Sequence, residues 1–349
     1  MEYTISVNTQ SERKVKDTKS IPFGVQPTEH MFIAEYKNGE WRNASIVPFT
    51  ELTMSPFALC LHYGQTVFEG MKAFMMQDGK VNIFRTDKHY DRFAKSLERM
   101  CMPVVPKGLF MEALHQLVHL DSSWVPEEED GSLYLRPFVI ASEERLGIKA
   151  AEEYLFLIVC TPAYQYYTQP LKVKVESRYI RAAEGGTGST KCGGNYGGAL
   201  YPTNLAREQG YDQVIWTDAK NHEYIEESGT MNLMFIIDGV LTTPPLSGTI
   251  LDGVTRDSML TIAKQLNIPV DVRPISYKEL KDALQSGKKI EAFGAGTAAV
   301  IAPIKTIGMD GEDYDCYIDE DAIMYQLKYE LFKIRRGLSE DLDKWNYII

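Results

Sequence analysis

A glycine-rich stretch around a single lysine is the first candidate for chemistry. Residues 185–198, GGTGSTKCGGNYGG, contain seven glycines and one lysine, Lys191. Because glycine has no Cβ, such a segment can approach a bound group closely. An amine presented in this way and shielded from water can attack a carbonyl and form a Schiff base. The same composition is equally compatible with a flexible linker, so other parts of the chain have to decide.

Three further segments would suit an anionic aldehyde cofactor. The run EESGTMN (226–232) carries carboxylates, and a carboxylate can keep a pyridine nitrogen protonated. The glycine-led turns GVT (253–255) and GAGTA (294–298) offer free backbone N–H groups, and the first opens a predicted helix, as in phosphate sites. Arg85, at the end of a predicted strand, could bind a phosphate through a charge-assisted hydrogen bond.

Each of these segments also has an ordinary structural explanation. Glu226 and Glu227 could be solvated surface charges, and Arg85 could pair with Asp87 or Asp91. Taken singly, chance matches of this kind outnumber functional ones. Taken together, three anion-ready turns in one chain favour the cofactor interpretation.

Other chemistries are less well supported. His115 and His119 are four residues apart but lack the glutamate of an HExxH zinc helix, so we expect them on the exposed or half-buried face of a helix, and we expect no metal site. No GxGxxG fingerprint or GK[ST] phosphate loop occurs. The tyrosines at 164, 166 and 167 are more typical of packing than of base stacking.

Length, charge and cysteine use limit the class of protein. A chain of 349 residues is expected to form two domains. Its net charge of -11 argues against nucleic acid as the main partner. No apolar run is as long as a membrane span, and the first twenty residues lack the apolar segment of a secretory signal. Five scattered cysteines without a CxxC pair indicate a reducing compartment, so we expect a cytoplasmic protein.

The first half of the chain reads as antiparallel strands with a pair of helices, an α+β pattern. Residues 1–30 are expected to form an extended arm. Asn38-Gly39 and Asp78-Gly79 predict two hairpin turns. Helical spacing predicts helices over about 86–100, capped by Thr86 or Asp87, and over 107–120, and two apolar runs predict strands at 134–141 and 154–160.

The second half alternates strands, helices and turns. We expect the inter-domain connection in the proline- and tyrosine-rich residues 161–170. Predicted strands lie at 171–177, 212–218, 232–238 and 240–244, predicted helices at 197–210, 253–266 and about 320–336, and a strand–turn–strand unit at 288–303. These expectations give a small α+β domain with an N-terminal arm (1–162), an inter-domain loop (163–170) and a large cofactor-binding domain (171–349).

Several long strings of this sequence resemble the branched-chain amino acid aminotransferases. The strings are LHYGQTVFEGMKAF (61–74), IFRTDKHYDRF (83–93), LYLRPFVI (133–140), KCGGNYGG (191–198), EESGTMNLMF (226–235), LDGVTRDS (251–258) and FGAGTAA (293–299). The resemblance covers the chain from about Pro22 to its C-terminus. It implies the two-domain D-amino-acid-aminotransferase-like fold, fold type IV of the pyridoxal-phosphate enzymes, a mixture of α+β and α/β structure with a small α+β domain and a larger domain containing a pseudo-barrel of strands.

The resemblance also implies how the cofactor, pyridoxal 5'-phosphate, is bound. Lys191 would form the Schiff base with the cofactor and later move the α-proton. Glu227 would contact the pyridine nitrogen, and Tyr196 would bond to the phenolic oxygen. The phosphate would be bound by Arg85, Val254, Thr255 and Thr297.

For the substrate, the resemblance implies a pocket shared with a second subunit. Tyr63, which comes from the partner subunit in this family, would receive the substrate carboxylate together with the amides of Thr297 and Ala298. The walls of the side-chain pocket would be Phe68, Tyr134 and Tyr164. A homodimer with its active site near the subunit interface is therefore expected.

Arg136 could explain how one pocket accepts both apolar amino acids and glutamate. The pocket would have to accept leucine, isoleucine and valine, and then glutamate, yet an unpaired carboxylate in an apolar pocket costs several kcal/mol. Arg136 at the pocket edge could pair with the γ-carboxylate; the alternative is a structural ion pair within the sheet. One departure from the vertebrate family members is that Ala299 and Ala302 occupy the positions of a CxxC thiol switch.

The implied reaction is ping-pong transamination. L-leucine, L-isoleucine or L-valine would become the branched 2-oxo acid, and 2-oxoglutarate would then become L-glutamate. The alternatives are a D-amino acid transaminase or aminodeoxychorismate lyase of the same fold, or a pyridoxal-phosphate-binding protein without catalysis.

Overall fold

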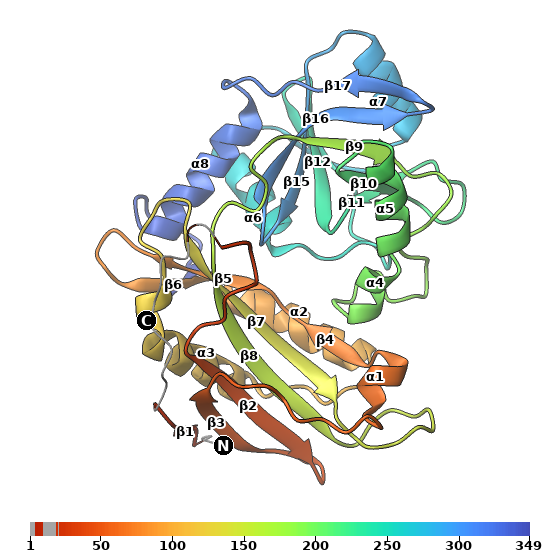
Figure 1. Cartoon of the computed structure of the whole chain (residues 1–349). Helices are drawn as coiled ribbons and strands as arrows, with labels where there is room; N and C mark the ends of the chain where they lie inside the picture. Colours follow the sequence, from red (N-terminus) through yellow and green to blue (C-terminus); the bar gives the residue numbers. More distant parts are fainter. Residues whose placement is uncertain (1–3, 10–18, 20) are drawn as a thin grey trace. The chain divides into compact units, whose positions relative to one another are not determined.

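The computed structural model describes residues 4–9, 19 and 21–349, and the chain divides into two compact units. Unit 1 comprises residues 1–166, 190–194 and 334–349, and unit 2 comprises 167–189 and 195–333 (Figure 1). The predicted arm at 1–30 lies partly outside the described residues. Among those described, no helix is both long enough and apolar enough to cross a membrane.

The division differs from the domain boundaries expected from the sequence, which placed all of 171–349 in one domain. Residues 190–194 group with unit 1 because Cys192 forms a β-bridge with Val67. The C-terminal residues group with unit 1 because strand β18 (Asn346–Ile348) pairs with strand β6 (Val81–Phe84). Strand pairing between segments that are far apart in the sequence therefore decides to which unit each segment belongs.

Unit 1 is built on one nine-stranded sheet in the order β1-β3-β2-β8-β7-β5-β6-β18, with β4 paired to β7. Its two predicted hairpins are present: β2 pairs with β3 and β5 with β6, antiparallel. The remaining strands of the sheet are β1 (Ser6–Val7), β2 (His30–Lys37), β3 (Glu40–Pro48), β4 (Thr66–Phe68), β5 (Met71–Met75), β7 (Ser132–Ala141) and β8 (Tyr154–Ala163).

Helices α2 (Thr86–Arg99) and α3 (Lys107–Leu120) cover one face of this sheet (Figure 1). Their apolar stripes join a core cluster in which Phe93 and Phe110 meet Phe156 of the sheet. Helix α1 (Leu59–Tyr63) and the short 3-10 helix η1 (Ser122–Trp124) complete the unit. The predicted capping of α2 is wrong: Thr86 is already helical, and the N-cap residue is Arg85, which makes no side-chain capping bond.

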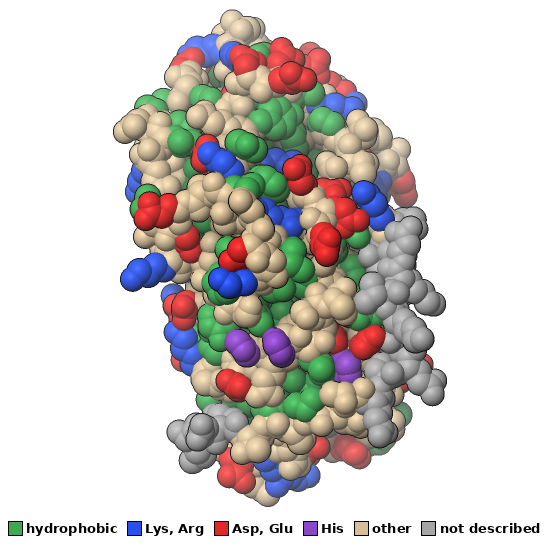
Figure 2. Space-filling model, turned by 90° about the vertical axis from the view of Figure 1, so that its left-hand side faces the viewer, with side chains coloured by type: hydrophobic (Ala, Val, Ile, Leu, Met, Phe, Trp, Pro, Cys, Tyr) green, Lys and Arg blue, Asp and Glu red, His purple; other side chains and the backbone are tan. Residues whose placement is uncertain are grey.

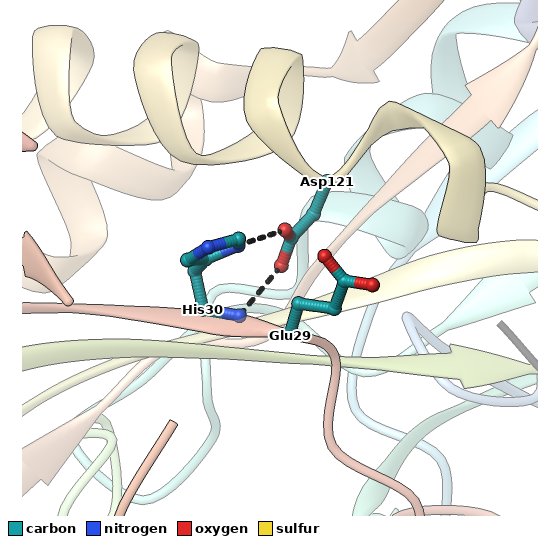
Figure 3. Close-up of side chains that lie close together, drawn as sticks. All are labelled: Glu29, His30 and Asp121. Carbon is teal, nitrogen blue, oxygen red and sulfur yellow. Dashed lines mark hydrogen bonds and ion pairs between the residues drawn. The ribbon is translucent and has the colours of Figure 1, made fainter. Parts of the chain in front are cut away.

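A buried histidine–carboxylate pair joins the start of β2 to the end of α3 (Figure 3). Asp121, the C-cap residue of α3, accepts the backbone N–H of His30 at 3.1 Å, and its other oxygen lies 2.6 Å from His30 Nδ1. The ligand-type atoms of Glu29, His30 and Asp121 lie within 4.8 Å of one another, close enough to hold a metal ion. Because two of the three are already hydrogen-bonded together, we interpret the cluster as a structural staple that also sets the histidine tautomer.

Replacing Asp121 with asparagine should therefore destabilise the fold. The substitution leaves a buried ring N–H or amide group without a suitable partner, and we expect the free energy of unfolding to fall by about 2 kcal/mol. Urea denaturation measures the change. Glu29→Gln is the matched control, because Glu29 is only partly buried and no hydrogen bond joins it to the pair. Equal losses in both variants would contradict the staple and favour a three-ligand metal centre.

Unit 2 contains a second nine-stranded sheet that closes on itself. The order β11-β10-β9-β16-β15-β12 returns to its start because β11 also pairs with β12, which makes a six-stranded barrel and confirms the expected pseudo-barrel. The strands are β9 (Leu171–Val175), β10 (Gln213–Thr217), β11 (Ile225–Ser228), β12 (Met231–Ile237), β13 (Val240–Thr243), β14 (Val270–Val272), β15 (Ile290–Gly296), β16 (Val300–Met309) and β17 (Glu312–Asp315).

The helices around the barrel match most predictions, with one correction. In place of one helix over 197–210, the chain forms α4 (Gly193–Gly197) and α5 (Leu200–Glu208). The break falls at Gly198-Ala199, directly after Gly197, and the two adjacent glycines make a continuous helix there costly in conformational entropy. The other helices are α6 (Val254–Gln265), α7 (Tyr277–Gln285) and α8 (Ile323–Arg336), whose last three residues belong to unit 1.

Candidate active site

In unit 1 the backbone of Lys191 is held on both sides. Its N–H donates to Ser96 Oγ of α2 at 3.0 Å, and its carbonyl accepts the N–H of Phe68 of β4 at 3.0 Å. The side chain is partly buried, with Nζ 4.8 Å from the centroid of the Phe68 ring. The lysine is therefore positioned by two elements of a packed unit, which is not the behaviour of a linker.

The turn that follows β4 is secured by a buried ionic network. Glu69 has no exposed surface and accepts hydrogen bonds from Arg92 at 2.6 and 2.8 Å, with His89 Nδ1 at 2.7 Å. Burial by itself raises the pKa of Glu69, but the positive charge of Arg92 and the bond with His89 outweigh it and lower the pKa. Glu69 consequently stays ionised and keeps Phe68 in place beside Lys191. Sequence reasoning missed this network, although an acid between Phe68 and Gly70 in an apolar string was a usable signal.

Arg85 occupies the turn between β6 and α2. Its φ of 59° is in the left-handed region, and its guanidinium lies 4.6 Å from the centre of the Trp345 ring. Its backbone N–H donates to the carbonyl of Trp345 at 2.7 Å. The acid considered as its partner, Asp87, forms a salt bridge with Lys107 at 2.6 Å. Arg85 is thus placed at the start of α2, where an anion would also meet free backbone N–H groups.

A cavity of about 300 Å³ opens on the unit 1 sheet beside two of the predicted pocket residues. Arg136 Nη2 donates to the hydroxyl of Tyr134 at 3.0 Å. Within the described residues Arg136 has no carboxylate partner, so the structural ion pair considered above is not formed there. The cavity is lined by Phe23, Gly24, Val25, Pro27, Phe49, Tyr134, Arg136, Val159, Cys160 and Thr161.

The Phe68 ring connects the cavity to the lysine. The Arg136 guanidinium lies 4.8 Å from the centroid of this ring, as Lys191 Nζ does. The two cationic groups therefore cannot be more than twice that distance apart. The structure thus brings together Lys191, Phe68, Tyr134 and Arg136, as the sequence suggested.

Phe23 is a lining residue that sequence reasoning did not find. It makes edge-to-face contacts with Tyr134 at 4.9 Å and with Tyr166 at 5.3 Å. Phe23 belongs to the predicted arm, where the sequence shows no helix or strand periodicity. The only indication that it is functional was an isolated aromatic residue next to Pro22.

Of the predicted substrate residues, only Tyr134 and Arg136 line the cavity. Tyr63 ends α1, is 45% exposed, and its hydroxyl donates to the carbonyl of Leu146. Tyr164 directly follows β8 and is partly buried.

The side chain of Tyr134 packs directly against the backbone of Gly70, which leaves no room for a Cβ at residue 70. A Cβ at residue 70 would lie 1.9 Å from the Tyr134 hydroxyl oxygen, a severe clash. Gly70→Ala should therefore displace Tyr134, break its bond with Arg136, and lower kcat/KM by about tenfold or more, as overpacking commonly costs 1–3 kcal/mol. Steady-state kinetics measure the loss. The matched control is Gly108→Ala, where no atom lies within 4 Å of the added Cβ; equal activities of the two variants would refute the role.

In unit 2, Glu227 of β11 is 3% exposed and surrounded by donors. Its Oε1 accepts the N–H of Leu251 at 2.8 Å and Asn232 Nδ2 at 3.2 Å. Arg181 Nε lies 3.0 Å from Oε2, an ion pair without the alignment of a hydrogen bond. Glu226 is also buried, with only 7% of its surface exposed. The interpretation of these two residues as solvated surface charges is therefore wrong.

Asn232 gathers this acid and both glycine-led turns at one place in unit 2. It pairs with Glu227 across β11–β12 and with Ala295 across β12–β15. Its side chain packs against Gly253, where a Cβ would lie 1.7 Å from Asn232 Oδ1. Gly253 is the N-cap residue of the twelve-residue helix α6 and has no side-chain cap, so the first N–H groups of the helix, including those of Val254 and Thr255, receive no cap from that residue's side chain.

The second turn, Thr297–Ala299, joins β15 to β16 directly after Ala295 and Gly296. Val300, which follows it, has a φ of 62°, a strained value for a β-branched residue. Strain of this kind is retained where a loop has a functional shape. Thr297 and Ala298 are partly buried on this turn.

Tyr196 lies on α4, five residues after Lys191, and is partly buried. The preceding Asn195 is hydrogen-bonded twice to Thr187, at 2.7 Å each, which ties α4 to the glycine-rich segment.

Each unit by itself carries groups whose chemistry suits part of a phosphorylated pyridine aldehyde. Unit 2 supplies a buried acid and two backbone turns suited to an anion, and Gly253 is needed because the side chain of Asn232 packs against it. Unit 1 supplies a positioned amine and Arg85. On the face that Figure 2 shows, by contrast, acidic and basic side chains are interspersed, which is typical of an ordinary protein surface.

Comparison with known proteins gives one consistent family. Residues 66–307 match the family model described as amino-transferase class IV. The chain is 44% identical over 301 residues to "Branched-chain-amino-acid transaminase 1" of Bacillus subtilis (strain 168), covering 85% of each chain. It is similar to the crystal structure of the branched-chain amino acid aminotransferase of Escherichia coli, with a TM-score of 0.75, 27% identity, and coverage of 91% of this chain and 98% of that one. A further solved branched-chain amino acid aminotransferase, complexed with N-(5'-phosphopyridoxyl)-L-glutamate, is 25% identical, with a TM-score of 0.73 and coverage of 92% and 98%.

The chain belongs to the class IV aminotransferases. It is an enzyme of the fold type IV architecture, and its cofactor is pyridoxal 5'-phosphate.

Proposed function

We propose that this enzyme transfers the amino group of L-leucine, L-isoleucine or L-valine to 2-oxoglutarate, giving branched 2-oxo acids and L-glutamate. The cavity beside Arg136 carries the proposal, because apolar and aromatic walls suit a branched side chain while an arginine without a carboxylate partner suits a γ-carboxylate. The relatives named above act on branched-chain amino acids, and they support the same substrate class here.

The proposed roles of the residues are those that the family resemblance implies. When bound, pyridoxal 5'-phosphate draws in the electron pair that remains when the α-proton leaves. Lys191 holds the cofactor through its amine and, once released, moves that proton. Glu227, surrounded by donors, would contact the pyridine nitrogen, and Tyr196 would bond to the phenolic oxygen. Phosphate binding falls to Arg85, Val254, Thr255 and Thr297.

For the substrate, Thr297 and Ala298 offer backbone amides to the α-carboxylate. Phe68 and Tyr134 would exclude water from the side chain, and Arg136 would bind the γ-carboxylate of glutamate. Tyr164, which does not line the cavity, is given no part in this wall. Tyr63 is proposed to complete the carboxylate site of a partner subunit, since its side chain is exposed. A homodimer follows from this role of Tyr63, and sedimentation velocity would test it. We also propose a cytoplasmic location, as expected from the cysteine content.

A spectral titration tests the function against its alternatives. Adding L-leucine, L-isoleucine or L-valine to the coloured holoenzyme should convert the absorption of the aldehyde form of the cofactor into that of the amine form, and 2-oxoglutarate should reverse it. D-alanine and aminodeoxychorismate should leave the spectrum unchanged. Conversion by D-alanine alone would favour the D-amino acid transaminase, and no response to any substrate would favour a protein that only binds the cofactor.

A further inference from the structure

Unit 2 contains a cavity that the proposed reaction does not use. Its volume is about 850 Å³, and Glu226 is among its lining residues. Glu226 and Glu227 are neighbours on β11, where the pairing with β10 is irregular. Their surroundings differ, because Glu227 accepts hydrogen bonds from Leu251 and Asn232, whereas Glu226 lines the cavity and Glu227 does not.

Glu226 is a buried carboxyl group with an unused oxygen. It is 7% exposed, and Oε1 accepts the hydroxyl of Thr249 at 2.5 Å. Its Oε2 has no hydrogen-bond partner among the described residues. Leaving such an oxygen without a donor is costly, so an oxygen of this kind indicates that a donor from outside the chain completes it.

Arg181, whose charge acts on Glu226, forms its hydrogen bonds with other groups. Arg181 donates through Nη2 to the carbonyls of Gly188 and Thr249, and its Nε pairs with Glu227. It therefore supplies no hydrogen bond to Glu226. Burial raises the pKa of Glu226, and the hydrogen bond from Thr249 and the charge of Arg181 offset this only in part.

The other charged residues of the lining are two acids and one lysine. Asp218 accepts four backbone N–H groups, from residues 220, 221, 223 and 224; although burial by itself raises its pKa, these bonds lower it and keep Asp218 ionised. Glu184 adds a further carboxylate, against one lysine, Lys220. The electrostatic potential of the cavity therefore favours a cation.

The cavity also has an apolar wall. Pro244, Pro245 and Pro274 line it together with the ring of Tyr224 and the side chain of Ile250. These groups cannot solvate a bare metal ion but suit a short hydrocarbon chain. A ligand that matches both walls carries one positive charge with an N–H donor on an alkyl group.

We propose that this cavity binds a protonated alkylamine, whose N–H donates to Glu226 and whose alkyl chain packs on the proline wall. A free amino acid fits less well, because its carboxylate would face Asp218 and Glu184. The site is distinct from the one that binds the substrate, and it does not depend on the proposed substrate specificity.

Calorimetric titration of the holoenzyme with N,N-dimethylbutylammonium tests the proposal. This tertiary amine has one N–H donor and cannot condense with the aldehyde of the cofactor. 2-Methyl-2-hexanol has nearly the same shape without the charge. We expect the amine to bind at least about tenfold more tightly than the alcohol, as a charge-assisted hydrogen bond gives. Equal affinities, or no saturable binding of the amine, would overturn the proposal.

Variants locate the binding. Glu226→Gln should weaken binding of the amine by about tenfold or more, and Lys220→Gln should strengthen it by removing a like charge. Glu208→Gln is the matched control, since Glu208 is exposed on α5 and does not line the cavity. Equal affinity in Glu226→Gln and Glu208→Gln would place the amine elsewhere and refute the assignment. If Glu226→Gln does not fold, the comparison of amine and alcohol on the unaltered protein decides alone.

Discussion

Replacing Lys191 with alanine should reduce transamination of L-leucine by at least about four orders of magnitude while leaving unit 1 folded. The loss is large because the residue would serve both as the attachment point of the cofactor and as the carrier of the α-proton, and removing a residue with two such roles disables every turnover. The fold should survive because both hydrogen bonds that hold residue 191 are made by its backbone. Coupled assay of 2-oxo acid formation measures the activity, and thermal unfolding measures the fold.

Two controls make this result specific. Lys278→Ala removes an exposed lysine of α7 that has no proposed role in catalysis. This variant should retain full transamination activity. Borohydride treatment of the unaltered holoenzyme, followed by peptide mapping, should find the cofactor covalently attached at Lys191 alone. Turnover in Lys191→Ala comparable with that of Lys278→Ala, or attachment at another lysine, would disprove the assignment.

Replacing Arg136 with methionine should separate the two half-reactions. Methionine is shorter than arginine, but it keeps an unbranched apolar stem and removes the charge. Glutamate would then bring a γ-carboxylate into the cavity without a counter-charge, which should slow its half-reaction by about thirtyfold or more. Leucine makes no demand on the guanidinium, and its half-reaction should change by less than about threefold. Stopped-flow absorbance of the cofactor measures each half-reaction separately.

The Tyr134→Phe variant refines this test. Tyr134 accepts a hydrogen bond from Arg136 Nη2, so its removal frees one donor of the guanidinium without removing the charge. We expect a smaller loss with glutamate than in Arg136→Met, and little change with leucine. If Arg136→Met slows both half-reactions equally, the residue supports the sheet rather than selecting the substrate.

Local chemistry accounts for what was predictable in the fold. The hairpins at Asn38-Gly39 and Asp78-Gly79 were predicted correctly because the conformation of a tight turn depends on the residues within it. Helix α6 was predicted with a start at Gly253, where the helix N-terminus and the preceding glycine are adjacent in sequence. The break between α4 and α5 was missed, although the two glycines that cause it were visible.

The substrate cavity shows where local reasoning ends. Phe23 contacts Tyr134 although the two are more than a hundred residues apart in the sequence. No feature of the sequence around either residue predicts this contact. The ionic network of Glu69, Arg92 and His89 likewise depends on how α2 packs against the sheet. Such contacts depend on burial and register, which a single sequence does not display.

By itself, the amino-acid sequence determined the reactive groups of this protein: a lysine among glycines, acids before a strand, and two turns able to bind a phosphate. Its resemblance to a family supplied the reaction class. Only the tertiary structure decided that Lys191 belongs to unit 1, that Asn232 brings Glu227 and both turns together in unit 2, and that Glu226 lines a cavity that its neighbour does not. The physical reason is that residue type sets what a group can do, whereas long-range strand pairing and burial set which groups meet.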